Sequence, residues 1–113
     1  ITVQGMDQLE RAVARMFCIG FDGTGIPPEV DALLKRGVGS AALFRRNVAG
    51  PAEFAGLCSQ LKSRAAGPLV IGIDQEGGRV QRFRSDGFTQ LPPMRAFGEV
   101  WMQGGKGGTG SRR

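Results

Sequence analysis

The sequence contains no histidine and no tyrosine, and it has only one tryptophan and two cysteines among its 113 residues. Without histidine, none of these residues can supply an imidazole acid or base for catalysis. The scarcity of tyrosine and tryptophan also disfavours a nucleic-acid-binding surface, on which bases commonly stack against aromatic side chains. Cys18 and Cys58 lie in apolar segments and are expected to be buried, reduced thiols, with a disulfide or a metal pair as the alternative.

The sequence also lacks an apolar stretch of membrane-spanning length and an opening leader in which charged residues precede an apolar segment. We therefore expect a cytoplasmic protein without a membrane partner. Lys106, Arg112 and Arg113 account for three of the five net positive charges, so the basic excess belongs mainly to the last twelve residues. A small basic nucleic-acid-binding protein is an alternative interpretation of this charge, but the rest of the chain predicts no nucleic-acid partner.

Three apolar segments, residues 16–21, 40–44 and 69–73, are predicted to be β-strands. Helical spacing of apolar residues predicts a short helix over residues 6–15 and two further helices, which follow Pro27-Pro28 and Gly50-Pro51 between the strands. The strands end at Asp22, Arg46 and Asp74, so the repeat is 24 to 28 residues long. This alternation predicts a parallel sheet joined by right-handed crossovers, with the three strand ends at one edge.

The most informative segment is 69–82, with the sequence LVIGIDQEGGRVQR. Its apolar start predicts a strand buried on both faces, and we expect Gln75 to Gly78 to leave the strand and turn. Asp74, Glu76 and Arg79 then emerge where ligands bind in α/β folds, with Arg82 just beyond. A phosphate-binding loop is a possible alternative for Gly72 and Gly77-Gly78, but the intervening acidic residues disfavour it.

Several motifs in residues 16–100 resemble the amino-terminal domain of glycoside hydrolase family 3. They are IDQEGGRVQR (73–82), GFT (87–89), LPPM (91–94), FDG (21–23) and LFRRN (43–47). The chain is most similar to the bacterial β-N-acetylhexosaminidases that act on peptidoglycan fragments, and a β-glucosidase-type member of the family is the alternative. The resemblance implies that the chain forms the opening three β/α units of a (β/α)₈ TIM barrel. It also implies a saccharide or muropeptide containing N-acetylglucosamine as partner and no cofactor or metal, whereas the oligomeric state stays open.

Site residues follow from the same resemblance. It implies an aspartate nucleophile and a histidine acid/base later in the barrel, so we assign no catalytic residue here and expect this chain to be inactive alone. It places Asp74 and Arg82 in the sugar-binding set. Asp74 as a turn residue that bonds nearby backbone, and Arg82 as an exposed charge or as the partner of Asp74, are the structural alternatives. We expect Glu76 and Arg79 to form an internal ion pair, and we expect Arg45 and Arg46 to brace the rim of the barrel.

The end of the sequence differs in character. Residues 83–100 are predicted to form an ordered loop with one helical turn near residues 94–97. Residues 101–113 are rich in glycine, so the predicted organisation is a partial barrel domain over 1–100 and a disordered tail over 101–113. Because this tail does not resemble the family, we expect a truncated chain or a change of reading frame near Trp101.

Overall fold

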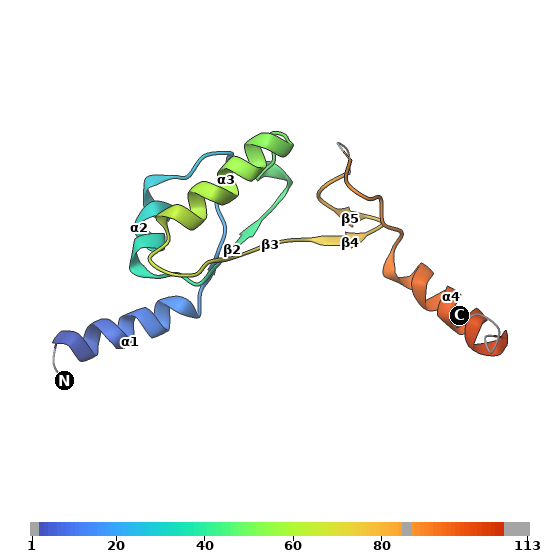
Figure 1. Ribbon diagram of the computed structural model, residues 1–113, viewed down its shortest axis with the longest axis horizontal. Helices are drawn as coiled ribbons and strands as arrows, with labels where there is room; N and C mark the ends of the chain where they lie inside the picture. Colours follow the sequence, from blue (N-terminus) through green and yellow to red (C-terminus); the bar gives the residue numbers. More distant parts are fainter. Residues whose placement is uncertain (1–2, 85–86, 108–113) are drawn as a thin grey trace. The chain divides into compact units, whose positions relative to one another are not determined.

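The computed structural model describes residues 3–84 and 87–107, and the chain divides into two compact units, residues 1–73 and residues 74–113. The first unit alternates helices and strands along the chain (Figure 1). Its elements are α1 (Val3–Arg15), β1 (Cys18–Ile19), α2 (Pro28–Arg36), β2 (Ser40–Leu43), the 3₁₀ turn η1 (Arg45–Asn47), α3 (Pro51–Arg64) and β3 (Val70–Ile73).

The three strands form one parallel sheet in the order β1-β2-β3. Cys18 pairs with Ser40, and β2 then pairs with β3 along its whole length, from Ser40 opposite Val70 to Leu43 opposite Ile73. Since all three strands run in the same direction, their carboxyl ends lie at one edge of the sheet. The prediction of a parallel sheet with a helix in each crossover is confirmed.

The hydrophobic core of this unit lies between the sheet and the two crossover helices, which pack against each other. Val30 and Leu34 project from α2 at a spacing of four residues, and Leu57 and Leu61 do so from α3. Burying each large aliphatic side chain stabilises the fold by roughly 1.5–3 kcal/mol. The seven buried residues of this core are Phe21, Val30, Leu34, Leu43, Leu57, Leu61 and Leu69.

Charges on the surface tie α2 to α3. Asp31 on α2 forms an ion pair with Lys35, whose Nζ lies 2.6 Å from Asp31 Oδ2. It forms a second one with Arg64 on α3, whose Nη1 lies 3.4 Å from Asp31 Oδ1. The hydrogen bond from Lys35, with support from Arg64, lowers the pKa of Asp31 below its ordinary value of 3.8, although partial desolvation opposes the shift. α2 then ends at Gly37, whose φ of 103° is the left-handed conformation that glycine adopts without strain.

Two predictions about the strands of this unit are wrong in detail. β3 is not buried on both faces: Leu69 and Ile71 pack against the core, whereas Val70 is 67% exposed on the other face. β1 is shorter than predicted because Met16 and Phe17 still donate backbone hydrogen bonds to the last turn of α1. Cys18 is exposed rather than buried, since helices cover only one face of the sheet.

The second cysteine differs from the first. Cys58 on α3 is partly buried against the core, and this burial raises the pKa of its thiol, with Lys62 opposing the shift. Both cysteines are free, and of the two thiols that were expected to be buried only that of Cys58 is partly so.

The second unit begins with a hairpin. β4 (Gln75–Gly77) pairs antiparallel with β5 (Val80–Gln81), although the sequence predicted that residues 75–78 would leave the strand conformation. The ladder tolerates the glycines through a shift in register between Gln75 and Gly77. Gly77 and Gly78 have φ values of 90° and 60°, so the expected turn follows directly after β4.

Helix α4 (Met94–Gly107) ends the described chain (Figure 1). It replaces the loop predicted up to residue 100 and continues through residues 101–107, where a disordered tail was expected; residues 108–113 lie outside the described part. Residues 94–103 include good helix formers, and Arg95 Nε pairs with Glu99 at 3.1 Å one turn later. These interactions carry the helix into the glycine-rich segment. No helix among the described residues is long and apolar enough to span a membrane.

Candidate functional site

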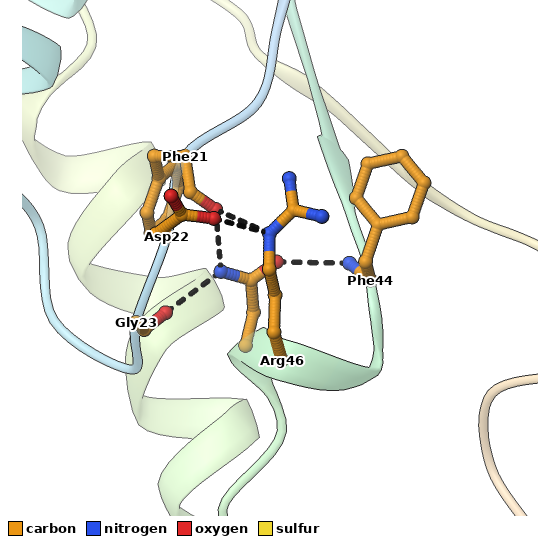
Figure 2. A network of polar contacts seen from close by, with 6 residues as sticks. Phe21, Asp22, Gly23, Phe44 and Arg46 are labelled. Carbon is orange, nitrogen blue, oxygen red and sulfur yellow. Dashed lines mark hydrogen bonds and ion pairs between the residues drawn. The ribbon is translucent and has the colours of Figure 1, made fainter.

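A buried amide connects the carboxyl ends of β1 and β2 (Figure 2). Asn47, which is 1% exposed, donates from Nδ2 to the carbonyl oxygens of Phe21 at 3.0 Å and Gly23 at 2.7 Å. Its Oδ1 accepts a hydrogen bond from the backbone N–H of Phe44 at 2.9 Å. One side chain therefore fixes the loop after β1 to the turn after β2, although in the sequence Asn47 stood out only as the last residue of the LFRRN motif.

Arg46 reinforces the same connection from the solvent side. Its Nε lies 3.2 Å from the carbonyl oxygen of Phe21 and 2.7 Å from Oδ1 of Asp22, as Figure 2 shows. Its guanidinium carbon lies 4.7 Å from the centre of the Phe44 ring, a cation–π geometry. Arg46 thus braces the loop after β1 against the turn after β2, whereas the side chain of Arg45 is exposed and makes no hydrogen bond or ion pair among the described residues.

The predicted sugar-binding residues, Asp74 and Arg82, lie next to each other in the second unit. Asp74 directly follows β3, and Arg82 directly follows β5. The backbone N–H of Arg82 donates to the Asp74 carbonyl oxygen at 3.3 Å, and Arg82 Nη2 lies 3.4 Å from Asp74 Oδ2. The Asp74 side chain is 52% exposed and that of Arg82 is 30% exposed. The hairpin thus pairs a carboxylate with a guanidinium, and part of each side chain reaches the surface.

The ion pair expected between Glu76 and Arg79 is absent from the described residues. Both side chains are exposed, and the turn that separates them is fastened by another arginine. Arg84 Nη2 donates to the carbonyl oxygens of Gly78 at 2.6 Å and Arg79 at 2.8 Å. The spacing of charges did not predict that Arg84 holds this turn, because Arg84 bonds backbone carbonyl oxygens, which every residue has, and not a carboxylate.

Gln81 is the second functional candidate that the sequence analysis missed. It is 3% exposed, and Gln81 and Asn47 are the buried polar residues of the described chain. The sequence carried no signal for this burial, because a polar side chain that follows Val80 on a strand is predicted to face solvent. Its amide holds the segment that follows Arg82, so it bears directly on the site.

The chemistry available here is hydrogen bonding to a polar ligand. The described residues contain no group of three or more histidine, cysteine or acidic side chains that could hold a metal ion. A carboxylate accepts hydrogen bonds from hydroxyl groups, while a guanidinium donates to hydroxyl, carbonyl or carboxylate oxygens. Asp74 and Arg82 together therefore suit a ligand that carries several hydroxyl groups.

Known proteins resemble this chain in sequence and in fold. The family model described as glycosyl hydrolase family 3 N terminal domain matches residues 9–104. A protein named Beta-hexosaminidase from Thiobacillus denitrificans is 58% identical over 64 residues, which make up 57% of this chain and 18% of that protein.

Solved structures agree with this match. A glycoside hydrolase family 3 beta-N-acetylglucosaminidase from Paenibacillus sp. str. FPU-7 has a TM-score of 0.72 at 38% identity, covering 80% of this chain and 18% of that chain. NagZ from Neisseria gonorrhoeae, solved in complex with N-trifluoroacetyl-D-glucosamine, has a TM-score of 0.68 at 35% identity over 78% of this chain and 25% of that chain.

These relatives are much longer than the present sequence. The chain spans between 18% and 26% of the length of the curated relatives that it matches. The family match nevertheless covers most of the chain, from α1 to α4, and includes both residues of the Asp74–Arg82 pair. The chain belongs to glycosyl hydrolase family 3, as part of its N-terminal domain.

Proposed function

We propose that this chain is the opening segment of a β-N-acetylhexosaminidase, an enzyme that removes terminal N-acetylhexosamine from β-glycosides such as peptidoglycan fragments. In this proposal its three strands are the first three of a (β/α)₈ barrel. The observation that carries the proposal is the Asp74–Arg82 pair, which directly follows the third parallel strand in a segment similar to beta-hexosaminidases. The carboxyl end of the strands is where barrel enzymes bind their substrates.

The geometry of the pair suits recognition of a terminal sugar. Arg82 approaches only Oδ2 of Asp74, and Oδ1 accepts no hydrogen bond from the described residues. The carboxylate therefore keeps acceptor capacity for sugar hydroxyl groups, while Arg82 limits its repulsion of electron-rich ligand oxygens. Asp74 directly follows β3, and its carbonyl oxygen accepts the backbone N–H of Arg82, so its backbone is held by the hairpin rather than by a long loop.

The proposal assigns binding, not bond cleavage, to this chain. Glycoside hydrolysis uses a general acid and, in retaining enzymes, a nucleophile on the opposite face of the sugar. The sequence has no histidine, and the aspartate nucleophile implied by the family resemblance comes later in the barrel. We expect the purified chain to release no nitrophenol from 4-nitrophenyl N-acetyl-β-glucosaminide above the buffer rate. Turnover by a preparation free of host enzyme would contradict this part of the proposal.

The binding role is tested in a complete enzyme. Residues 9–100 of this chain, which lie within the family match, replace the corresponding stretch of the N-terminal domain in the Thiobacillus denitrificans relative, once that relative is shown to hydrolyse the nitrophenyl substrate. A hydrogen bond to a charged group contributes about 1.5–3 kcal/mol, so Asp74→Ala should lower kcat/KM about ten- to 150-fold. Arg82→Ala should cost as much or somewhat less.

Glu76→Ala is the matched control, because this carboxylate lies two residues from Asp74 but is exposed without an ion pair among the described residues. It should change kcat/KM by less than about twofold. An active chimera in which Asp74→Ala stays within twofold, while Glu76→Ala abolishes turnover without unfolding the protein, would show that the two carboxylates have the opposite roles.

A further inference from the structure

The segment after β5 is held by the side-chain amide of Gln81. Its Nε2 donates to the carbonyl oxygens of Phe83 at 2.8 Å and Thr89 at 2.9 Å. Its Oε1 accepts a hydrogen bond from the backbone N–H of Leu91 at 2.9 Å. A single buried amide thus joins three backbone positions, one just after Arg82 and two in the following segment.

A second amide, that of Gln75 on β4, holds Phe83 from the opposite strand. Gln75 Nε2 donates to the carbonyl oxygen of Phe83 at 3.1 Å, and Gln75 Oε1 accepts from the backbone N–H of Phe83 at 3.2 Å. The side chain of Gln75 therefore bonds both backbone groups of Phe83, as a paired residue in a β-ladder would do. In effect it extends the hairpin by one rung beyond β5.

Arg82 lies between these two attachments. Gln81 precedes it with a buried side chain, Phe83 follows it with both backbone groups bonded, and its own N–H donates to the Asp74 carbonyl oxygen. A backbone fixed on both sides restricts where the guanidinium can reach. We infer that Gln81 and Gln75 are positioning residues, which hold Arg82 beside Asp74 in the geometry that receives the sugar. This inference rests on the sugar-binding role proposed above for Asp74 and Arg82.

An amide suits this task better than other side chains of similar size. Each attachment requires donation to a carbonyl oxygen and acceptance from an N–H, which only an uncharged amide provides with one group. Methionine has nearly the same length and volume but neither function, so it removes the bonds that the replaced amide makes: at position 81 those to Phe83, Thr89 and Leu91, and at position 75 those to Phe83. Gln81→Met and Gln75→Met therefore remove the attachments while changing the packing little.

The first measurement uses the whole 113-residue chain and needs no activity. NMR relaxation of the Arg82 side-chain Nε–H reports how far the guanidinium is ordered, and hydrogen exchange reports the N–H groups of Phe83 and Leu91. We expect Gln81→Met to expose Leu91 and Gln75→Met to expose Phe83, by about tenfold or more in exchange rate. Either variant should lower the order of Arg82 Nε–H. The control is Gln90→Met, because Gln90 is an exposed glutamine that bonds only the carbonyl oxygens of Arg84 and Phe88.

The second measurement places the same variants in the chimeric enzyme. A loss of positioning for a group that binds the sugar equally in ground and transition states should raise KM about five- to thirtyfold and leave kcat nearly unchanged. A merely structural role for the glutamines would instead lower the amount of active enzyme and leave KM as it was. Gln75→Met keeps the test valid if Gln81→Met fails to fold, since Gln75 is only partly buried.

The positioning role of the glutamines and the proposed sugar site can be refuted separately. If Asp74→Ala raises KM but neither glutamine variant differs from Gln90→Met in KM or in Arg82 order, the positioning role is wrong and the proposed function stands. If Asp74→Ala and Arg82→Ala leave KM unchanged, the proposed sugar site is wrong, and with it the role of the glutamines toward a sugar.

Discussion

Replacing Asn47 by alanine should destabilise the chain more than other polar substitutions in the first unit. The change removes two hydrogen bonds donated by Nδ2, to Phe21 and Gly23, and one accepted by Oδ1 from Phe44. The carbonyl of Gly23 lies in an exposed loop and can bond water instead. The Phe21 carbonyl oxygen keeps the bond from Arg46 Nε, whereas the N–H of Phe44 lies in a partly buried residue, where water replaces the lost bond only in part.

The magnitude follows from these three bonds. Each contributes a net of about 0.5–1.5 kcal/mol, and an unsatisfied buried group costs more, so Asn47→Ala should lower the free energy of unfolding by about 2–4 kcal/mol. With a urea dependence of about 1–2 kcal/mol per molar for a chain of this size, the unfolding midpoint should fall by roughly 1–4 M. Asn47→Asp should cost at least as much, because its carboxylate keeps the acceptor but points a charge at two carbonyl oxygens.

The assay is urea unfolding followed by circular dichroism at pH 7. Trimethylamine N-oxide in all samples preserves a native baseline if the chain is marginally stable. Ser63→Ala is the control, since the exposed Ser63 hydroxyl bonds only Gln60 in its own helix, and it should change stability by less than about 0.5 kcal/mol. A folded Asn47→Ala protein whose loss of stability does not exceed that of Ser63→Ala would refute the reasoning.

Further outcomes concern pH, close packing and association. Because the folded-state pKa of Asp31 lies below 3.8, its stabilisation should be complete well above that pH and disappear as the pH falls toward the folded value; the stability difference from Asp31→Asn in urea titrations should shrink over that range and stay constant between pH 5 and 8. Gly39→Ala should lower the free energy of unfolding by about 1–3 kcal/mol, and so lower the melting temperature, because its Cβ would overlap the carbonyl oxygen of Arg15. Gly56 lies in a helix with open space around it, and Gly56→Ala should raise the free energy of unfolding by up to about 1 kcal/mol. β3 has only β2 as a neighbour in the described chain and exposes Val70, so sedimentation velocity should show association that grows with concentration; a monodisperse monomer with a sharp, reversible thermal transition would contradict this.

The repeating pattern of apolar residues was sufficient to predict the order of helices and strands in the first unit. The helical spacing of Leu57 and Leu61 and the apolar strand before Asp74 follow from burial, which acts locally on the sequence. Exposure of Val70 was not predictable in the same way, because a strand covered by helices on one face and a strand covered on both faces can have equally apolar sequences. Helix α4 extends further than predicted because neighbouring helix formers outweigh individual glycines, a balance that composition alone does not give.

The candidate site was predictable where charge and strand ends coincide, and less so where neutral groups act. The proximity of Asp74 and Arg82 was foreseen as a possible ion pair, although their binding of a sugar stays a prediction. Asn47 and Gln81 were missed because an amide has no fixed partner in the sequence: it bonds whichever backbone groups the loops bring to it. The expected Glu76–Arg79 pair failed for the related reason that exposed charges gain little from pairing.

The position of the core along the chain has a consequence for synthesis on the ribosome. Every buried residue of the core cluster lies between Phe21 and Leu69, so the cluster is complete before the hairpin with Arg82 has been translated. At about 5–20 residues per second, translation of the remaining chain takes seconds. Small domains of mixed α/β type commonly fold faster than that. The core therefore needs no residue of the second unit, and the nascent polypeptide can bury it as soon as this part has left the ribosome, while the edges of its sheet are still unpaired.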